Sequence, residues 1–247
     1  MQTTFIFRRA LQTLLPVTLL LSACSKSDTP APAPPADQGR VIAYHMAASA
    51  NVGLKILLDD AEKATLTYGQ NSGYQTLNTG SRSIKVNVAS SNANAATQAV
   101  MVEKDRSYSY FAYAPTATTV AGLLVTDELS APATGQAKIR LVHLGQGAPS
   151  PLKISAPSVA GQVDVANINV VFANASSFVE IPAGPYNLAV TTGPQSNVVA
   201  NVGDGSGSGT GSKTYEAGKI YTVVLRGISG ALVDPALQPK AVLIQNN

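Results

Sequence analysis

The stretch RLVHLGQGAPSPLKI, residues 140–154, repeats an earlier stretch, VIAYHMAASANVGLKI, residues 41–56. Aligned without gaps, the two stretches superimpose His143 on His45 and one Leu-Lys-Ile triplet on the other, at an offset of 98 residues. A repeat of about 100 residues is too long for a solenoid unit and is typical of a complete domain. The chain therefore duplicates a domain.

The correspondence continues beyond this stretch, and its offset grows in steps. Val86 corresponds to Val190 at an offset of 104, and Tyr108 corresponds to Tyr221 at an offset of 113. Such growth is expected when insertions fall in the loops between conserved strands.

Each copy contains short runs rich in Val, Ile, Tyr, Phe and Thr, bounded by Gly, Pro, Asn and Ser. This pattern predicts antiparallel strands of a sandwich. The strands expected in the first copy are 40–47, 53–59, 64–69, 73–77, 82–89, 97–103, 107–114 and 121–127. Helical periodicity does not persist beyond two turns, and the Ala-rich segment 89–99 is the one candidate exception. We expect an all-β chain with two tandem immunoglobulin-like antiparallel β-sandwich domains.

The N-terminus has the pattern of a processing signal. Arg8 and Arg9 precede a short apolar segment, and LSAC, residues 21–24, follows it. That motif resembles the lipobox of bacterial lipoproteins, in which the cysteine carries the lipid. Cys24 is the only cysteine, so a disulfide framework is excluded and lipidation accounts for the thiol. An ordinary secretory signal with a chance cysteine is the alternative.

The segment after Cys24 is rich in Pro and Ala and has almost no large apolar side chains, so we expect an extended tether. At about 3.1 Å per residue, it could hold the first domain up to about 45 Å from the bilayer. Its CSKSD start loosely resembles the surface-export signals of Bacteroidetes lipoproteins. The expected organisation is a signal peptide (1–23), a lipidated tether (24–39) and two β-sandwich domains (40–134 and 135–247).

The charge balance argues against nucleic acid as a partner. Removal of residues 1–23 lowers the 17 basic side chains to 15, against 14 acidic ones. A nearly neutral chain with scattered cations lacks the positive surface on which phosphate binding depends.

The motifs of the second copy also resemble a known family. IRLVH, APSPLKI, VFANASSF, IPAGPYNLAV and YEAGKIYTVVLRG, all within residues 138–226, look like the bacterial repeat family catalogued as domain of unknown function 4397. The resemblance is weaker over 40–127. It implies an exported or lipid-anchored protein and supplies no activity. Family members commonly follow the histidine with Ser-Pro-Asp-Ala-Pro, whereas this chain has MAASAN and LGQGAPS.

His45 and His143 are the only histidines and occupy equivalent positions, each at the end of a first strand. An imidazole there can bridge backbone groups and hold the next loop, and this structural role is our expectation. As ligand candidates they are weak, because no cluster of His, Cys, Asp or Glu surrounds either one in the sequence. We therefore expect no metal site and no cofactor.

The segment GDGSGSGTGSKT, residues 203–214, has the wrong spacing for a phosphate-binding loop, because Ser212 stands where that loop needs glycine. It coincides with growth of the repeat offset and is expected to be a flexible insertion. Asp204 within it is a weak calcium candidate, since one carboxylate supplies too few oxygen ligands.

Other polar and aromatic groups also have ordinary explanations. The acids at 59, 60, 62, 127 and 128 are expected to be solvated at strand ends. The tyrosines of YSYFAYA, residues 108–114, could form a sugar platform, but Tyr108 aligns with Tyr221 and favours repeated packing. The chain has no G-x-S-x-G motif, and its one cysteine is assigned to the lipid.

These observations predict a protein of the cell envelope, lipid-anchored to the outer membrane through Cys24. The orientation stays open between the cell surface and the periplasm. The leading hypothesis is a non-catalytic binding, adhesion or spacer module, with an envelope polysaccharide or a protein as partner. One alternative is a glycan-processing accessory or hydrolase with a carboxylate cleft. Another is a subunit of an envelope complex that pairs through a strand edge.

Overall fold

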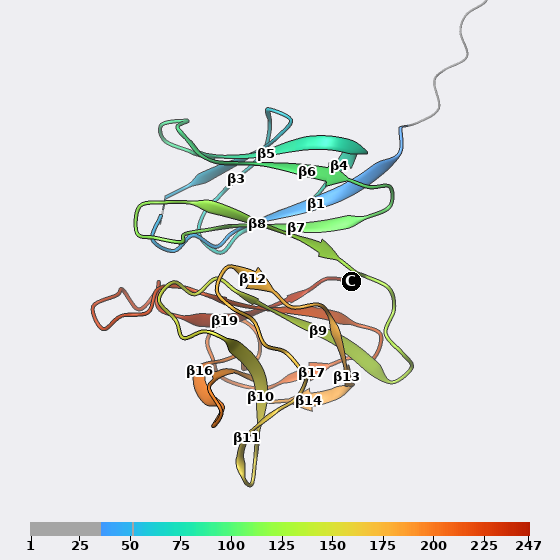
Figure 1. Cartoon of the computed structure of the whole chain (residues 1–247), viewed down its shortest axis with the longest axis vertical. Helices are drawn as coiled ribbons and strands as arrows, with labels where there is room; N and C mark the ends of the chain where they lie inside the picture. The colour runs from blue at the N-terminus through green and yellow to red at the C-terminus, as the bar shows by residue number, and fades with distance from the viewer. Residues whose placement is uncertain (1–35, 51) are drawn as a thin grey trace, which may run out of the picture. The chain divides into compact units, whose positions relative to one another are not determined.

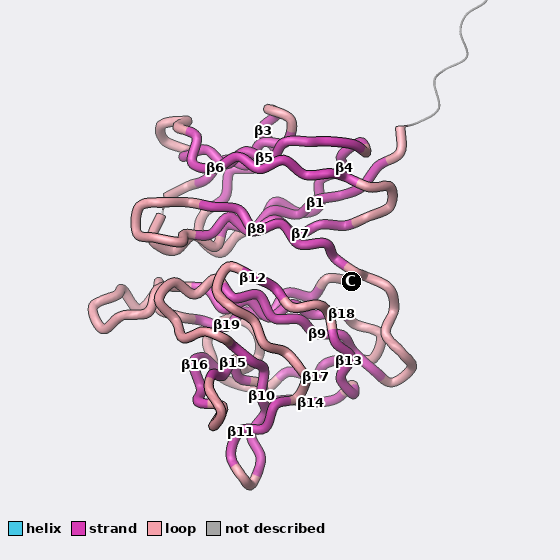
Figure 2. Tube along the Cα trace, in the orientation of Figure 1, coloured by secondary structure: helices cyan, strands magenta, loops and turns pink. Residues whose placement is uncertain are grey.

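The computed structural model describes residues 36–50 and 52–247, and residues 36–247 form one compact unit. Strands and loops make up all of this part of the chain, with no helix among the described residues (Figure 2). The predicted all-β fold is confirmed. Among the same residues, we find no helix with the length and hydrophobicity needed to cross a bilayer.

The first repeat folds into two four-stranded sheets that face each other (Figure 1). One has the order β4-β1-β7-β8 and the other has the order β3-β2-β5-β6. The strands are β1 (Gln38–His45), β2 (Leu54–Leu58), β3 (Ala61–Leu66), β4 (Asn71–Asn78), β5 (Gly80–Val88), β6 (Asn94–Val102), β7 (Ser107–Tyr113) and β8 (Ala121–Asp127).

The second repeat contains the same pair of sheets in a more fragmented form, with the orders β12-β9-β18-β19 and β11-β10-β15-β16. The short strand β13 also pairs with β9, and β14 pairs with β17. The strands are β9 (Gln136–His143), β10 (Leu152–Ser158), β11 (Gly161–Asp164), β12 (Asn174–Ala175), β13 (Val179–Pro182), β14 (Gly184–Tyr186), β15 (Ala189–Thr192), β16 (Asn197–Asn201), β17 (Lys213–Tyr215), β18 (Ile220–Arg226) and β19 (Lys240–Gln245).

The strand pairings reproduce the alignment of the two copies. Ile56 of β2 lies opposite Val86 of β5, and the corresponding Ile154 of β10 lies opposite Val190 of β15. Equivalent strands pair in parallel in both halves, β1 with β7 and β9 with β18. The strand pattern of the sequence predicts only antiparallel pairing, so these two parallel pairs are a correction.

Alternating apolar side chains fill a core inside each half. Leu54, Ile84 and Tyr110 belong to the first core, and Leu152, Leu188 and Val223 belong to the second. A third cluster draws side chains from both halves: Ile42, Tyr44, Met46 and Phe111 from the first, and Val142, Leu144 and Val224 from the second. Because the halves share this cluster inside one compact unit, the division into domains 40–134 and 135–247 stays a prediction.

The Ala-rich segment is not helical. Its residues up to Ala93 form a turn in which Asn92 has a φ of 57°, and β6 then begins at Asn94. Pairing with β5 satisfies its backbone groups, so tertiary context outweighs the helix propensity of alanine.

Candidate functional site

The two repeats meet through equivalent sheets, and an ion pair lies at the centre of their junction. Asp127 ends β8, and Arg140 lies in the middle of β9. Nη2 of Arg140 lies 2.5 Å from Oδ1 of Asp127, and the two side chains are 1% and 0% exposed. An unpaired charge in such a place costs several kcal/mol, so each group depends on the other.

Hydroxyl groups from both halves complete this network. Oγ of Ser109 donates to Oδ2 of Asp127 at 2.8 Å, and Nε of Arg140 donates to Oγ1 of Thr222 at 2.9 Å. Thr222 donates in turn to Oδ1 of Asn246 at 2.8 Å. In the alignment of the copies, Ser109 corresponds to Thr222 and Asp127 to Asn246. Equivalent positions of the two repeats therefore meet at one buried point.

The expectation of a solvated Asp127 was wrong. Its carboxylate is removed from water because a cation and a hydroxyl replace the lost hydration. Glu128, the next residue, is exposed and forms an ion pair with Arg106 at 2.6 Å. The acids at 59, 60 and 62 lie at the exposed β2–β3 turn, where lysine and arginine side chains pair with them.

Aromatic contacts cross the junction in both directions. The guanidinium carbon of Arg226, from the second repeat, lies 4.6 Å from the ring centre of Tyr68 in the first. At the corresponding place, Tyr113 of the first repeat packs edge-on against Phe172 of the second, with 5.9 Å between ring centres. Together with the ion pair, these contacts join the two halves.

The junction also perturbs a tyrosine. Burial raises the pKa of Tyr74 to about 12, and the nearby Asp127 carboxylate adds to this effect. The hydroxyl of Tyr74 donates to Oδ2 of Asp127 at 3.4 Å, so a neutral phenol supports the buried anion. Arg140 itself stacks on Phe178, with 4.4 Å between its guanidinium carbon and the ring centre.

Both histidines are fully buried and hold the loops that follow their strands. Nε2 of His45 lies 2.9 Å from the carbonyl oxygen of Val52, and Nε2 of His143 lies 3.1 Å from that of Pro149. A carbonyl accepts, so Nε2 carries the proton in both rings. The pKa of each imidazole is lowered, chiefly because burial disfavours its charged form.

A cleft opens at the edge of the junction, directly beside the ion pair. Its volume is about 410 Å³, within the range of small-ligand sites. It is lined by Val125, Thr126, Glu128, Lys138, Arg140, Ala175, Ser176, Ser177 and Phe178. The first repeat supplies three of these residues and the second supplies the others, so the cleft exists only while the halves stay joined.

The charges of this cleft leave one cation available. Asp127 neutralises Arg140, and Arg106 pairs with Glu128. Nζ of Lys138 donates to the carbonyl oxygen and the hydroxyl of Ser130, at 2.7 and 2.8 Å, and forms no ion pair within residues 36–50 and 52–247. The cleft thus combines an ammonium group with hydroxyls and part of an aromatic ring.

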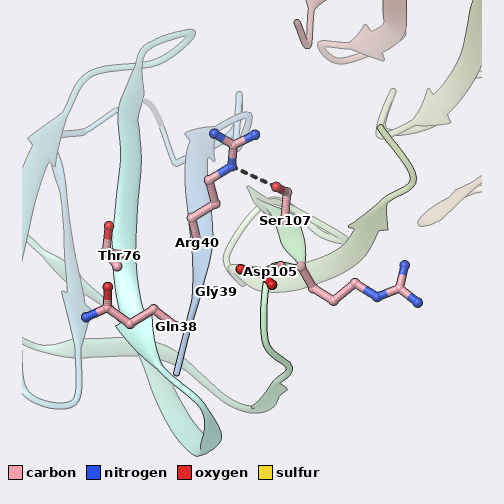
Figure 3. A pocket seen from close by; sticks show the side chains of 7 residues that line it. Gln38, Gly39, Arg40, Thr76, Asp105 and Ser107 are labelled. Atoms are coloured by element: carbon pink, nitrogen blue, oxygen red, sulfur yellow. Dashed lines mark hydrogen bonds between the residues drawn. The ribbon is translucent and has the colours of Figure 1, made fainter. Parts of the chain in front are cut away.

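A second cavity, of about 300 Å³, lies beside the start of β1 (Figure 3). Arg40 reaches across it, and its Nε donates to Oγ of Ser107 at 2.7 Å. Asp105 contributes the only carboxylate to its lining. Its other cation, Arg106, is paired with Glu103 and Glu128. With both cations engaged and an anion nearby, this cavity is a weaker candidate than the junction cleft.

The tyrosines of YSYFAYA form no exposed platform. Tyr108 and Tyr110 lie in the first core, and the hydroxyl oxygen of Tyr108 accepts from the backbone N–H of Glu103 at 3.1 Å. Tyr221 accepts from the N–H of Glu216 at the same distance. The repeated residue therefore makes a repeated structural hydrogen bond.

The glycine-rich segment packs against β19 rather than standing free. A side chain at Gly205 would place its Cβ 2.6 Å from Cβ of Leu243. Oδ1 of Asp204 accepts from the backbone N–H and the hydroxyl of Ser206, and these bonds lower the pKa of Asp204. Within the described part of the chain, no three His, Cys, Asp or Glu side chains converge on a metal position.

The predicted lipidation residue, Cys24, lies outside the described residues, as do the predicted signal peptide and most of the predicted tether.

The model of a family described as Domain of unknown function (DUF4397) matches residues 47–150. The predicted family resemblance is confirmed. The DUF4397 match covers less than half of the chain and lies mainly over the first repeat, whereas the motifs had indicated the stronger resemblance in 138–226. No curated protein matches the sequence.

Solved structures show only weak likeness to this chain. The Bacillus anthracis TIE protein has a TM-score of 0.24 at 10% identity. The match covers 77% of this chain and 34% of the TIE protein. This chain thus spans about a third of that relative. A Parabacteroides distasonis protein described as a cell adhesion protein has a TM-score of 0.21 at 10% identity. The match covers 85% of this chain and 99% of that protein. A family 26 carbohydrate-binding module from Eubacterium rectale, in complex with maltoheptaose, has a TM-score of 0.21 at 9% identity. The match covers 85% of this chain and 97% of that module.

Sequence reasoning missed the junction, although the alignment of the copies contained a signal. Arg140 stands where the first copy has Ile42, and Asp127 stands where the second copy has Asn246. Each copy thus has one charged residue where the other copy has an uncharged one, and the two charges have opposite signs. Such a pattern indicates an ion pair between the two repeats.

Proposed function

We propose that this protein is a non-catalytic binding module of the cell envelope, whose ligand site is the cleft between its two repeats. One observation carries the proposal: a cleft of ligand size has a floor made rigid by the buried Asp127–Arg140 pair. Preorganised sites bind more tightly because fewer groups must be ordered on binding. The duplication then serves to build one composite site, rather than two independent sites joined by a hinge.

The chemistry of the cleft favours an acidic saccharide. Lys138 offers a cation without a carboxylate partner among the described residues, and Ser176 and Ser177 offer hydroxyls that donate and accept. Phe178 adds an apolar contact for a sugar ring.

Anchorage belongs to the same proposal. Lipid on Cys24, followed by the Pro- and Ala-rich segment, would hold residues 36–247 at the outer membrane. Replacement of Cys24 by serine in the full chain should move the protein from the membrane fraction to the soluble fraction. Retention of the C24S chain in the membrane would refute lipid anchorage.

The binding site is tested by thermal unfolding of residues 36–247 with envelope polysaccharides and uronic acid oligosaccharides. A ligand at a hundredfold excess over its Kd stabilises the native state by about 2.7 kcal/mol. We expect a shift with acidic saccharides that Lys138→Ala and Phe178→Ala abolish. Lys153→Ala, which removes an exposed ion pair with Asp164 in another cavity, is the matched control and should keep the shift. An unchanged transition with every saccharide would refute the proposal.

A hydrolytic function has one observation in its favour. Glu103 and Glu128 both line a groove of about 460 Å³ between β6 and β8. Arg106 pairs with both carboxylates, at 3.5 and 2.6 Å. A glycosidase needs one carboxyl group that gives a proton to the substrate, and this arrangement is instead a salt-bridge network. Release of reducing ends from a polysaccharide, lost in Glu103→Gln and Glu128→Gln, would favour the hydrolase.

A further inference from the structure

The junction cleft adjoins a second hollow across strand β8. The groove of about 460 Å³ between β6 and β8 shares two lining residues with the cleft, Thr126 and Glu128. Leu124 lines the groove and its neighbour Val125 lines the cleft, as expected for a strand whose successive side chains point to opposite faces. The two hollows therefore lie on the two faces of β8 and meet at its C-terminal end.

The end of β8 forms a low rim between the hollows. β8 lies between β6 of the first repeat and β12 of the second (Figure 1), and among the described strands it pairs with β7 alone. The ion pair between Arg106 and Glu128 stands at this rim, with side chains 46% and 58% exposed. Exposed ion pairs contribute little to stability, so a ligand displaces this one at small cost. A ligand longer than the cleft thus has a path into the groove.

The groove has an apolar wall that suits the C–H face of a sugar ring. Met101 of β6 lines this wall and is 62% exposed, and Leu124 and Ala99 lie beside it. Methionine adapts its shape to a ligand because its side chain is unbranched and polarizable. Thr126 adds a hydroxyl group that donates and accepts. An apolar lining with a few polar groups is typical of a ligand site.

The two hollows differ in charge. Lys138, which has no carboxylate partner among the described residues, gives the cleft an excess positive charge. The groove is lined by the carboxylates of Glu103 and Glu128 and by the guanidinium of Arg106. Arg106 lies closer to Glu128, at 2.6 Å, than to Glu103, at 3.5 Å. Glu103 therefore gives the groove an excess negative charge, which repels an acidic sugar.

We propose that the cleft and the groove form one extended site for a linear glycan that combines acidic and neutral sugars. An acidic sugar lies at Lys138, and a neutral sugar lies against Met101. This extended site rests on the proposed function, which it enlarges from one sugar to a chain. A glycan with a charge on every sugar would set a carboxylate beside Glu103, and a neutral glycan would leave Lys138 without a partner.

Two substitutions separate the two features of the groove. Met101→Ala removes the apolar contact, and Glu103→Gln removes the excess negative charge. The side chains are 62% and 65% exposed, so neither substitution disturbs the core. Val198→Ala is the matched control, because Val198 is a 48% exposed apolar residue of β16 that lines neither hollow.

The measurement is calorimetric titration of residues 36–247 with hyaluronan oligosaccharides, in which glucuronate and N-acetylglucosamine alternate. The hexasaccharide should bind at least about tenfold more tightly than the disaccharide, because it also fills the groove. Met101→Ala should weaken hexasaccharide binding by at least about fourfold, the effect of one buried methylene, and leave disaccharide binding unchanged. Val198→Ala should change neither dissociation constant.

A galacturonate hexasaccharide, which has a charge on every sugar, tests the charge pattern. It should bind more weakly than the hyaluronan hexasaccharide, and Glu103→Gln should narrow the difference. Equal affinities of the disaccharide and the hexasaccharide, of the two hexasaccharides, or of Met101→Ala and the unsubstituted protein for the hyaluronan hexasaccharide would overturn the extended site. If Lys138→Ala still abolished binding in those cases, the proposed function would stand. Absence of binding with every saccharide would refute both.

Discussion

The carboxylate of Asp127 and the guanidinium of Arg140 come from different copies of the repeat, yet they form one buried ion pair with 2.5 Å between Oδ1 and Nη2. Neither group has an equivalent charge in the other copy, where Asn246 and Ile42 stand in their places. The first copy supplies the acid and the second supplies the base. The pair therefore favours contact between unlike copies, because two like copies would bring two buried charges of the same sign together.

The two halves are expected to unfold together. The apolar cluster shared by Phe111 and Val224 and the buried ion pair both break when either half unfolds. Calorimetry of residues 36–247 should show one transition with equal calorimetric and van't Hoff enthalpies. Two resolved transitions would mean that the halves are independent domains.

Two tyrosines of β7 should respond oppositely to loss of their hydroxyl. Tyr108 accepts a backbone hydrogen bond from Glu103, so Tyr108→Phe should lower the free energy of unfolding by about 0.5–1.5 kcal/mol. The hydroxyl of Tyr110 is buried without a partner among the described residues, so Tyr110→Phe should be neutral or stabilising. Urea denaturation of the two variants measures both values. An equal loss in both would contradict this account of the hydroxyls.

Stability should fall on mild acidification because of the buried histidines. Burial lowers the pKa of His45 and of His143 below 6.5, so the unfolded chain binds protons at a higher pH than the folded chain. Their contribution is complete above pH 6.5 and is lost as the pH falls below it, by at most about 1.4 kcal/mol per pH unit for each histidine.

The control for this pH effect is the double variant His45→Gln with His143→Gln. Glutamine does not titrate, so the variant should have a lower stability at neutral pH and a shallower loss below pH 6.5. Urea denaturation as a function of pH measures the slope, and an identical slope in the variant would assign the loss to other groups.

Alanine substitutions at Gly205 and Gly211 distinguish the cost of backbone strain from the cost of a packing clash. Both have positive φ, 88° and 75°, so an alanine is strained at either position. A side chain at Gly205 also collides with Leu243, whereas one at Gly211 meets its nearest atom at an ordinary 3.5 Å. Gly205→Ala should therefore cost about 1–3 kcal/mol more than Gly211→Ala in thermal unfolding. Equal costs would show that packing against β19 contributes nothing.

Local patterns in the sequence were enough to predict the strands. Apolar and polar residues alternate in LKI and its neighbours, and turn residues separate the runs. From this pattern, the eight strands of the first repeat were predicted within a few residues of their observed bounds. The pairing of the strands agrees with the alignment of the copies, since Ile56 pairs with Val86 and the corresponding Ile154 pairs with Val190. Which strands pair was not predicted.

The junction could not be predicted in the same way because burial there depends on tertiary partners. Asp127 ends a strand, and most acids in that position are solvated. Contact with Arg140, which belongs to the other repeat, offsets the free-energy cost of burying this carboxylate. Likewise, the alanines of β6 favour a helix locally, and their pairing with β5 decides the outcome.

The central claim, that the two repeats are joined through Asp127 and Arg140, is tested most directly by a double-mutant cycle. Asp127→Asn and Arg140→Ile each introduce the residue that the other copy carries at the equivalent place. Each single substitution should lower the free energy of unfolding by about 3–5 kcal/mol, because it leaves a buried charge unpaired. The double variant removes both charges and should lose less than either single variant, so the coupling energy should be at least about 3 kcal/mol. Additive losses, with no coupling between the two positions, would contradict the claim.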